Sequence, residues 1–317
     1  MATRRSFGNS SLQVSPLAFG GNVFGWTLNE SESFRILDAF LDAGFNFIDT
    51  ADTYSKWAEG NQGGESETIL GNWFRQRGRR DDVILATKLG GDMGAGRKGL
   101  KAGYVKEAVE ASLKRLKTDY IDLYQTHYDD PETPVEETME ALNRLIDEGK
   151  VRYIGASNYT AERIAQSNEF ARQHGMQGYI SLQPLYNLHD RQQFEESYLP
   201  LVEQEKLAVI SYYALASGFL SGKYRSKEDL GKSVRGQKAI QYLDDRGHRI
   251  LAALDEVAAA HQVAPAQVAI AWQLHKPFIT APIVSATTEK QLAELAGAAS
   301  LELSPEQVAL LDQASAY

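Results

Sequence analysis

The stretch "FNFIDTADTY" (residues 45–54) decides how we interpret the fold of this 317-residue chain. Its first half alternates Phe45 and Phe47 with Asn46 and Ile48, as a strand with two distinct faces requires. It then ends in two aspartates, two threonines and a tyrosine. A strand with a buried body and a polar end is expected where the carboxyl ends of parallel strands form a site.

Seven more short apolar runs share this character and alternate with amphipathic helical patterns. The runs cover residues 15–20, 83–88, 120–127, 151–158, 179–187, 207–215 and 281–287. The helical patterns include residues 31–44, with Ser31 as N-cap and Gly44 as the stop, and residues 66–78, which end at Gly78. Strands that alternate with helices pair in parallel, since a parallel pair needs a crossover. Eight such units predict a TIM (β/α)8 barrel, with residues 1–317 as a single domain.

The rival architecture is an open, doubly wound sheet. That fold normally carries a G-x-G-x-x-G turn after its first strand. Here the corresponding segment reads "FGGNVFGW" (residues 19–26), which does not match. Two connections, residues 55–66 and 222–245, are longer than a barrel requires. Both follow strands, so we expect them on the carboxyl-end rim, where long loops are often functional.

Charge and composition exclude several classes of function. The chain has 33 Lys and Arg against 42 Asp and Glu, a net charge of −9, which disfavours nucleic acid and anionic membranes as partners. There is no cysteine, so disulfides, thiolate metal ligands and a cysteine nucleophile are excluded. The N-terminal residues lack the apolar core of a signal peptide, and no apolar run is long enough to span a membrane. We therefore expect a soluble, cytoplasmic protein.

Neither metal nor serine chemistry has a supporting motif. None of the six histidines has H-E-x-x-H or H-x-H spacing, and no G-x-S-x-G elbow occurs. We predict no metal site.

Four residues near the ends of neighbouring strands make a coherent chemical set: Asp49, Tyr54, Lys88 and His127. A tyrosine, with an unperturbed pKa of about 10, becomes a better acid when an ammonium favours its phenolate, and an aspartate can hold that ammonium. The histidine could then orient the oxygen that receives the proton. Each residue alone has an ordinary structural explanation, but together on one rim they favour proton delivery to a carbonyl oxygen. We interpret nearby Asp52 as a loop-capping carboxylate.

Several segments then resemble the aldo-keto reductase family, in order along nearly the whole chain. They are "GFNFIDTADTY", "ATK" (86–88), "YIDLYQTH", "GKVRYIGASNY", "QPLYN", "SYYALASGFLSGKY" and "APIVSATTEKQL". The resemblance implies a TIM barrel that reduces aldehydes and ketones reversibly with NADPH or NADH. It implies that Tyr54 is the general acid, that Lys88 and Asp49 tune it, and that His127 orients the substrate.

The resemblance also implies a set of cofactor contacts. Ser157, Asn158 and Gln183 would hold the nicotinamide carboxamide, and Tyr212 would stack on the ring. The pyrophosphate would lie under a loop containing Leu215, Ser217, Gly218 and Lys223. Gly21, Asn22 and Asp49 complete the predicted set at this end of the cofactor.

At the adenosine end the match to the family is weaker. Thr287 stands where relatives often have an arginine for the 2′-phosphate, and Lys290 is the nearby cation, with Ser285 and Gln291 as hydrogen-bonding partners. The resemblance to the family still implies NADP as the expected cofactor, with NAD as the alternative. The predicted substrate-binding residues, at the mouth, are Trp26, Tyr54, Trp57, His127 and Tyr128.

Two other functions stay open at this point. The same barrel serves as a cofactor-sensing regulatory β subunit of potassium channels, with little turnover. A barrel isomerase or aldolase could instead use Lys88 as a Schiff base. The expected partner is a small carbonyl or alcohol substrate, and these motifs assign no oligomeric state.

Overall fold

A closed parallel barrel forms the centre of the molecule. The computed structural model describes residues 3–317, so residues 1 and 2 of the N-terminal stretch considered above for a signal peptide lie outside it. Eight strands pair in parallel in the order β10-β3-β4-β5-β6-β7-β8-β9. They are β3 (Ala18–Gly20), β4 (Phe47–Asp49), β5 (Ile84–Leu89), β6 (Ile121–Thr126), β7 (Val151–Ser157), β8 (Ser181–Gln183), β9 (Ala208–Val209) and β10 (Ile283–Val284). The predicted TIM barrel is confirmed, and each strand lies within its predicted run except β5, which extends one residue beyond it to Leu89.

Backbone hydrogen bonds close the sheet between its first and last strands. The amides of Thr280 and Ala281 donate to Val209 O at 2.9 and 3.2 Å, and Ile283 N donates to Ser211 O at 2.8 Å. The parallel register then places strand ends side by side, with Gly20 beside Asp49 and Lys88 beside Gln125. The polar residues predicted at separate strand ends therefore share one rim.

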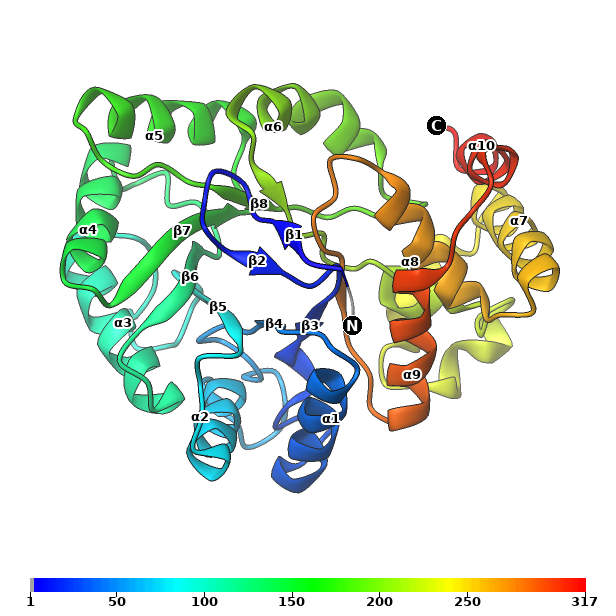
Figure 1. Cartoon of the computed structure of the whole chain (residues 1–317), viewed down its shortest axis with the longest axis horizontal. Coiled ribbons are helices and arrows are strands. Elements are labelled where there is room, and N and C mark those ends of the chain that lie inside the picture. Colours follow the sequence, from blue (N-terminus) through cyan, green and yellow to red (C-terminus); the bar gives the residue numbers. More distant parts are fainter. Residues whose placement is uncertain (1–2) are drawn as a thin grey trace.

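Helices surround the barrel (Figure 1). They are α1 (Glu30–Asp42), α2 (Glu65–Arg77), α3 (Ala102–Leu116), α4 (Val135–Asp147), α5 (Ala161–Gln173), α6 (Leu199–Glu205), α7 (Asp245–His261), α8 (Pro265–His275), α9 (Glu289–Gly297) and α10 (Pro305–Ala314). Gly78 ends α2 as predicted, in the left-handed conformation (φ 63°) that glycine adopts readily.

The predicted N-cap of the first helix is wrong. Asn29, not Ser31, caps α1: its side chain accepts from Glu32 N at 3.0 Å, while Glu32 accepts from Asn29 N at 2.9 Å. Ser31 instead lies inside the first turn, where its hydroxyl donates to the Asn29 side chain. The reciprocal Asn–Glu pair satisfies two amides at the helix start, which is why the N-cap lies two residues earlier than predicted.

A short hairpin, not predicted from the sequence, lies across one end of the barrel (blue in Figure 1). It pairs β1 (Arg5–Ser6) with β2 (Gln13–Val14) in antiparallel fashion. Phe7 and Val14 are fully buried and pack with Phe47 and Leu123 from inside the barrel. The hairpin therefore seals the end opposite the polar rim with an apolar cluster, which leaves that rim as the accessible end.

The long connection after β9 is built from short helices. These are η3 (Ala216–Ser221), η4 (Lys227–Lys232) and η5 (Gly236–Tyr242), which lead into α7. The last helix, α10, packs against α7 and α8. Within residues 3–317, no helix is both long and apolar enough to cross a bilayer. In the same residues, no group of three or more acidic or histidine side chains is placed to hold a metal ion.

Candidate active site

Asp49, Lys88 and Tyr54 form one contiguous group inside the barrel, as predicted. Lys88 Nζ donates to Asp49 Oδ2 at 2.6 Å, to Thr50 O at 2.7 Å and to Tyr54 OH at 3.2 Å. The side chains of Lys88 and Asp49 are 0% and 1% exposed, so the ion pair is shielded from bulk solvent. The ammonium thus has three oxygen partners, one of which is the predicted proton donor.

The ionisation of this group differs in one respect from expectation. Burial raises the pKa of Tyr54, and the opposing effect of the Lys88 ammonium does not overcome it. The pKa of Lys88 is raised despite its burial, because Asp49 and Tyr54 favour its charged form. Tyr54 therefore holds its proton at neutral pH, and Lys88 stays an ammonium. An ammonium is a poor nucleophile, which argues against a Schiff-base role for Lys88.

His127 follows β6 and faces the same space. Its ring lies 5.9 Å from the Tyr54 ring and stacks on Tyr128 at 4.6 Å. Burial, with the nearby Lys88 charge, holds the pKa of His127 well below its usual range. Its Nδ1 atom is buried and has no hydrogen-bond partner among residues 3–317. A neutral ring beside Tyr54 can donate one N–H to a substrate oxygen, as predicted for a substrate orienter.

Aromatic side chains line the mouth above Tyr54. Trp57 packs edge-on against Tyr54 at 5.5 Å and against Trp26 at 5.7 Å. Trp57 and Tyr128 are about half exposed, at 50% and 51%. Neighbouring exposed aromatic rings often mark a binding site. These rings form a surface suited to a flat apolar group.

The residues predicted for the carboxamide are linked by hydrogen bonds. Ser157 Oγ donates to Gln183 O at 2.9 Å, and Asn158 Nδ2 donates to His127 O at 2.8 Å. Tyr212 OH donates to Asn158 Oδ1 at 3.0 Å. Burial and neighbouring tyrosines raise the pKa of Tyr212 to about 12, so its hydroxyl stays a donor. This polar set joins the candidate cofactor side directly to the backbone of His127.

The loop predicted to cover a pyrophosphate has an unusual backbone. Ala216, Ser217 and Gly218 have φ values of 48°, 57° and 92°, directly after Leu215. The amides of Ala216 and Gly218 donate to Tyr213 O and Leu215 O, at 2.7 and 2.8 Å, so Ser217 N is the amide of this run left to face an anion. A side-chain Cβ on Gly218 would lie 3.0 Å from Lys223 Cε, so glycine lets this lysine approach the loop. The geometry suits a phosphate group.

Arg235 is a residue that the sequence reasoning missed. Its guanidinium lies 5.1 Å from the Trp26 ring centre and donates to the side-chain oxygen of Asn22. Burial lowers the pKa of Arg235, and among residues 3–317 no carboxylate lies within ion-pair distance. The only signal in the sequence is the basic run "GKSVRGQK" inside the long 222–245 connection. A partly buried cation with no acidic partner favours an anionic ligand.

Asn22 joins this arginine to the predicted contacts near β3 and β10. With its amide nitrogen turned toward Gly20 O (3.2 Å) and Ser285 Oγ (2.9 Å), its oxygen accepts from Arg235. Ser285 Oγ also donates to Gly20 O at 2.9 Å. Gly21 begins a short helix (η1, Gly21–Val23) here, and Ser66 donates to its carbonyl at 2.8 Å. Gly21, Asn22 and Ser285 are therefore brought together.

The remaining adenosine-end residues lie around the start of α9. Thr287 N and Oγ1 both donate to Gln291 Oε1, at 2.9 and 3.0 Å. Thr288 caps the helix by accepting from Gln291 N at 3.2 Å. Lys290 is exposed on the first turn and makes no ion pair with any residue from 3 to 317. Hydrogen bonds thus link Thr287 with Gln291, whereas the Lys290 side chain makes no hydrogen bond with either.

Asp52 contradicts the sequence-based interpretation. The Asp52 side chain is 2% exposed, and neither carboxyl oxygen makes a hydrogen bond of good geometry with a described residue; the Thr53 amide and the Arg115 charge only partly oppose the effect of burial on its pKa. Burial, reinforced by the negative charge of Glu67, raises the pKa of Asp52 to about 8. A capping carboxylate would accept backbone amides, so the predicted capping role is wrong.

The comparisons with known proteins agree with this geometry. A family model described as "Aldo/keto reductase family" matches residues 16–316. The chain is 37% identical over 298 residues to a "Probable voltage-gated potassium channel subunit beta" of Oryza sativa subsp. japonica, covering 92% of this chain and 89% of that protein. It is 35% identical over 313 residues to "Uncharacterized oxidoreductase YrpG" of Bacillus subtilis, covering 96% and 93%. It is 36% identical over 315 residues to "Norsolorinic acid reductase stcV" of Emericella nidulans, covering 94% and 78%.

A barrel with polar strand ends and a matching family model defines the class of this protein. The chain belongs to the aldo/keto reductase family. This membership supports an oxidoreductase, carbonyl reduction as the general reaction, and a nicotinamide cofactor.

Proposed function

We propose that this protein is a cytoplasmic enzyme that reduces an aldehyde or ketone to an alcohol with NADPH or NADH, with Tyr54 as the proton donor. The observation that carries the proposal is the position of Lys88 Nζ, which touches Asp49 Oδ2 at 2.6 Å and Tyr54 OH at 3.2 Å. This contact places the ammonium where it can stabilise a Tyr54 phenolate.

Tyr54 would release its proton only when a base appears beside it. Its raised pKa keeps the phenol protonated in the free enzyme. As negative charge develops on a carbonyl oxygen, the proton moves from Tyr54 to that oxygen, and the Lys88 ammonium stabilises the phenolate left behind. Asp49 keeps Lys88 charged and in place, and neutral His127 donates a hydrogen bond that orients the carbonyl.

The cofactor groove would run from Asn158 and Gln183 toward α9. When bound, a nicotinamide cofactor supplies the hydride. Asn158, Ser157 and Gln183 would hold its carboxamide, and the Tyr212 ring would fix the face presented to the substrate. Lys223, Arg235 and the Ser217 amide would bind its phosphates. At the adenosine end, Lys290 would be the cation for a 2′-phosphate, with Thr287 and Gln291 as hydrogen-bonding partners. We therefore keep NADP as the expected cofactor and NAD as the alternative.

We expect a ring-bearing substrate. Trp26, Trp57 and Tyr128 offer flat apolar surface directly above Tyr54. Relatives named norsolorinic acid reductases occur in Emericella nidulans and in Aspergillus species, which is consistent with a substrate of this shape.

The test is reduction of a panel of aromatic and aliphatic aldehydes and ketones, with each reduced cofactor. Parent enzyme should oxidise NADPH in the presence of aromatic carbonyls, whereas Tyr54→Phe should lose about 10²–10⁴-fold in kcat/KM with cofactor binding intact. Equal turnover by parent and Tyr54→Phe would overturn the role of Tyr54. Oxidation of cofactor by aliphatic carbonyls alone would overturn the ring-bearing substrate.

A second candidate is a cofactor-sensing subunit, favoured by the similarity to probable potassium channel β subunits. It predicts tight cofactor binding, seen by nicotinamide fluorescence, with negligible turnover for every carbonyl tried. Turnover that depends on Tyr54 would exclude this candidate as the main activity.

A further inference from the structure

A cation without a counter-ion lies at the mouth of the candidate active site. The Arg235 guanidinium lies over the Trp26 ring, 5.1 Å from its centre, and donates to the side-chain oxygen of Asn22. No aspartate or glutamate among residues 3–317 lies within ion-pair distance of it. Burial lowers the pKa of Arg235, and the hydroxyls of Tyr213 and Tyr54 are near enough to oppose this effect. The charge therefore lies close to the predicted proton donor.

A second arginine in the same connection shows how the protein pairs a cation that no ligand needs. Arg225 is exposed, and its two Nη atoms donate to the two carboxylate oxygens of Asp255, both at 2.7 Å. A guanidinium that has lost water gains most from an anion bound in this forked geometry. Since the solvated arginine is paired and the partly buried Arg235 is not, we expect the anion for Arg235 to come from a ligand.

The backbone on both sides of Arg235 is held in place. The Arg235 amide donates to Ser233 Oγ at 3.3 Å, and the Gly236 amide donates to Ser233 O at 2.9 Å. A Cβ on Gly236 would lie 1.8 Å from Leu230 O, so glycine allows the two stretches of chain to approach this closely. Arg235 is thus presented from a tight turn and not from an extended loop.

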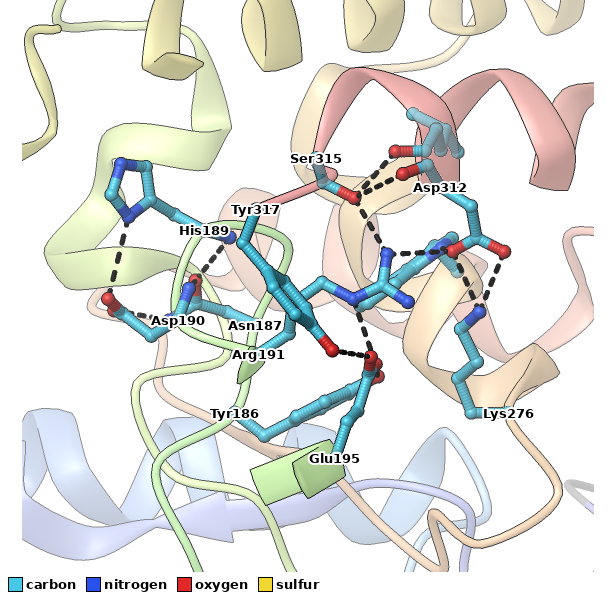
Figure 2. Close-up of polar contacts among 12 residues, drawn as sticks. Tyr186, Asn187, His189, Asp190, Arg191, Glu195, Lys276, Asp312, Ser315 and Tyr317 are labelled. Carbon is cyan, nitrogen blue, oxygen red and sulfur yellow. Dashed lines mark hydrogen bonds and ion pairs between the residues drawn. The ribbon is translucent and has the colours of Figure 1, made fainter. Parts of the chain in front are cut away.

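The short helix that starts after Arg235 is anchored at its far end. Arg235 is the N-cap of η5, and Tyr242, the last residue of η5, donates its hydroxyl to Asp190 Oδ2 at 2.9 Å. Asn187 holds the same carboxylate oxygen from Nδ2 at 3.0 Å, and Figure 2 shows this pair in the loop after β8. Asn187 also donates to Tyr213 O at 3.1 Å. A cation positioned before the ligand arrives binds it at a lower cost in conformational entropy.

A continuous wall of aromatic rings connects Arg235 to the reacting end of the site. Trp26, under the guanidinium, packs edge-on against Trp57 at 5.7 Å, and Trp57 packs against Tyr54 at 5.5 Å. A flat ring that lies on this wall with its carbonyl group at Tyr54 extends toward Trp26. A negative substituent on such a ring would approach the guanidinium.

We infer that Arg235 is a specificity-determining residue that binds a carboxylate on the substrate, so that this protein prefers aromatic aldehydes or ketones that carry one. The inference rests on the proposed function, because it names the class of substrate reduced at Tyr54. A guanidinium has five N–H donors, so one hydrogen bond to Asn22 and a contact to a cofactor phosphate do not exhaust it. At a net charge of −9 most of the surface repels an anionic substrate, and a local cation at the mouth is what selects it.

The kinetic test compares meta- and para-formylbenzoate with their methyl esters at saturating NADPH. The ester keeps the ring and the aldehyde but removes the charge. The ratio of kcat/KM for carboxylate over ester should fall by about 10- to 100-fold from the parent to Arg235→Met for at least one of the two isomers. The change should lie mainly in KM, because the carboxylate is remote from the reacting carbon. Each ratio compares two substrates on one enzyme–cofactor complex, so any effect of the variant on cofactor binding cancels.

Two further variants separate the guanidinium from charge in general. Arg235→Lys keeps the charge without the fork and should retain part of the parent's ratio. Lys227→Met removes an exposed cation of η4 in the same connection and should retain all of it. An unchanged ratio in Arg235→Met would overturn the inference and leave Arg235 as a cofactor contact, and an equal fall in Lys227→Met would overturn it as a local effect.

Binding of compounds that cannot be reduced tests the anion site without turnover. Benzoate and benzamide have no aldehyde or ketone group, and quenching of tryptophan fluorescence reports their binding beside Trp26 and Trp57. The preference for benzoate over benzamide should be present in the parent and lost in Arg235→Met. That result without turnover of any carbonyl compound would overturn the proposed function and support the anion site. Turnover that depends on Tyr54, with the same preferences in parent and Arg235→Met, would overturn the anion site alone.

Discussion

The inner and outer faces of the barrel wall carry two polar clusters whose residues are neighbours in sequence. On the inner face, Asp49 accepts from Lys88 on one oxygen and from Gln125 and Gln183, at 3.0 and 2.9 Å, on the other. On the outer face, Asp52 makes no hydrogen bond of good geometry with any residue from 3 to 317, although Glu67 beside it accepts from Thr87 at 2.6 Å and Arg115 at 2.7 Å. Asp49 and Asp52 are 1% and 2% exposed, so partners and not solvent distinguish them. The hydrogen bonds of the inner cluster stabilise the Asp49–Lys88 ion pair. The surroundings of the outer cluster favour the protonated, neutral form of Asp52.

Removing the inner cation should have the largest effect. Lys88→Met should lower kcat/KM by about 10²–10⁴-fold, because the phenolate of Tyr54 loses its stabilising charge. It should also lower the free energy of unfolding by about 3–5 kcal/mol, because Asp49 is left as a buried charge without its partner. Steady-state kinetics and urea unfolding measure the two effects.

The double variant Lys88→Met/Asp49→Asn sharpens this result. An amide at position 49 removes the unpaired charge, so most of the stability should return while activity stays low. Unchanged stability of Lys88→Met would mean that the inner pair does not hold charge in the way inferred from its distances.

The carboxyl group of Asp52 should change how the free energy of unfolding depends on pH. The pKa of Asp52 is raised from 3.8 to about 8 on folding. Between these pH values the unfolded state has lost a proton that the folded state keeps, so Asp52 makes the free energy of unfolding fall as pH rises. Asp52→Asn removes this slope and should stabilise the protein by as much as about 4 kcal/mol at pH 7, with little further gain above about pH 8.

Urea unfolding from about pH 4.5 to about pH 8.5 measures this difference between variant and parent. Asp81→Asn, at a carboxylate whose side chain is 86% exposed, is the matched control and should leave the parent's slope unchanged. A parent and an Asp52→Asn variant with parallel curves would show that Asp52 is already charged in the folded protein.

The two clusters also mark how far the sequence could predict the site. Asp49, Lys88 and His127 were predictable because each ends a short apolar run, and parallel strands bring such ends together. Tyr54 followed from the same motif. The position of the strands was therefore enough to assemble the inner cluster before any contact was known.

The features that the sequence did not predict depend on contacts that leave no periodic pattern in the sequence. The strands of the β1–β2 hairpin are two residues long, too short to show alternation. Arg235 lies in an irregular connection, so nothing in its neighbours indicates that it reaches Trp26. The orphaned state of Asp52 is a lack of partners in space, which no local pattern encodes.

Removing the side-chain amide of Gln125 on the inner face should lower stability and activity less than removing the Lys88 cation. Gln125→Leu removes one of the two donors to Asp49 Oδ1, which should lower the free energy of unfolding by about 2 kcal/mol and kcat/KM by about tenfold or less. Gln173→Leu, on the exposed side of α5, should change neither. Full activity and stability in Gln125→Leu would show that Gln183 alone satisfies the carboxylate.

The smallest effect is expected one residue away, on the other face of the same strand. Tyr124 is fully buried, and its hydroxyl has no hydrogen-bond partner among residues 3–317. Because removing an unpaired buried hydroxyl relieves a desolvation cost, Tyr124→Phe should change the free energy of unfolding by less than about 0.5 kcal/mol or increase it. Urea unfolding beside Gln125→Leu compares the two faces directly. A loss of about 2 kcal/mol or more would mean that a bound water or ion satisfies Tyr124 and Asp52, and the contrast between a satisfied inner face and an unsatisfied outer face would fail.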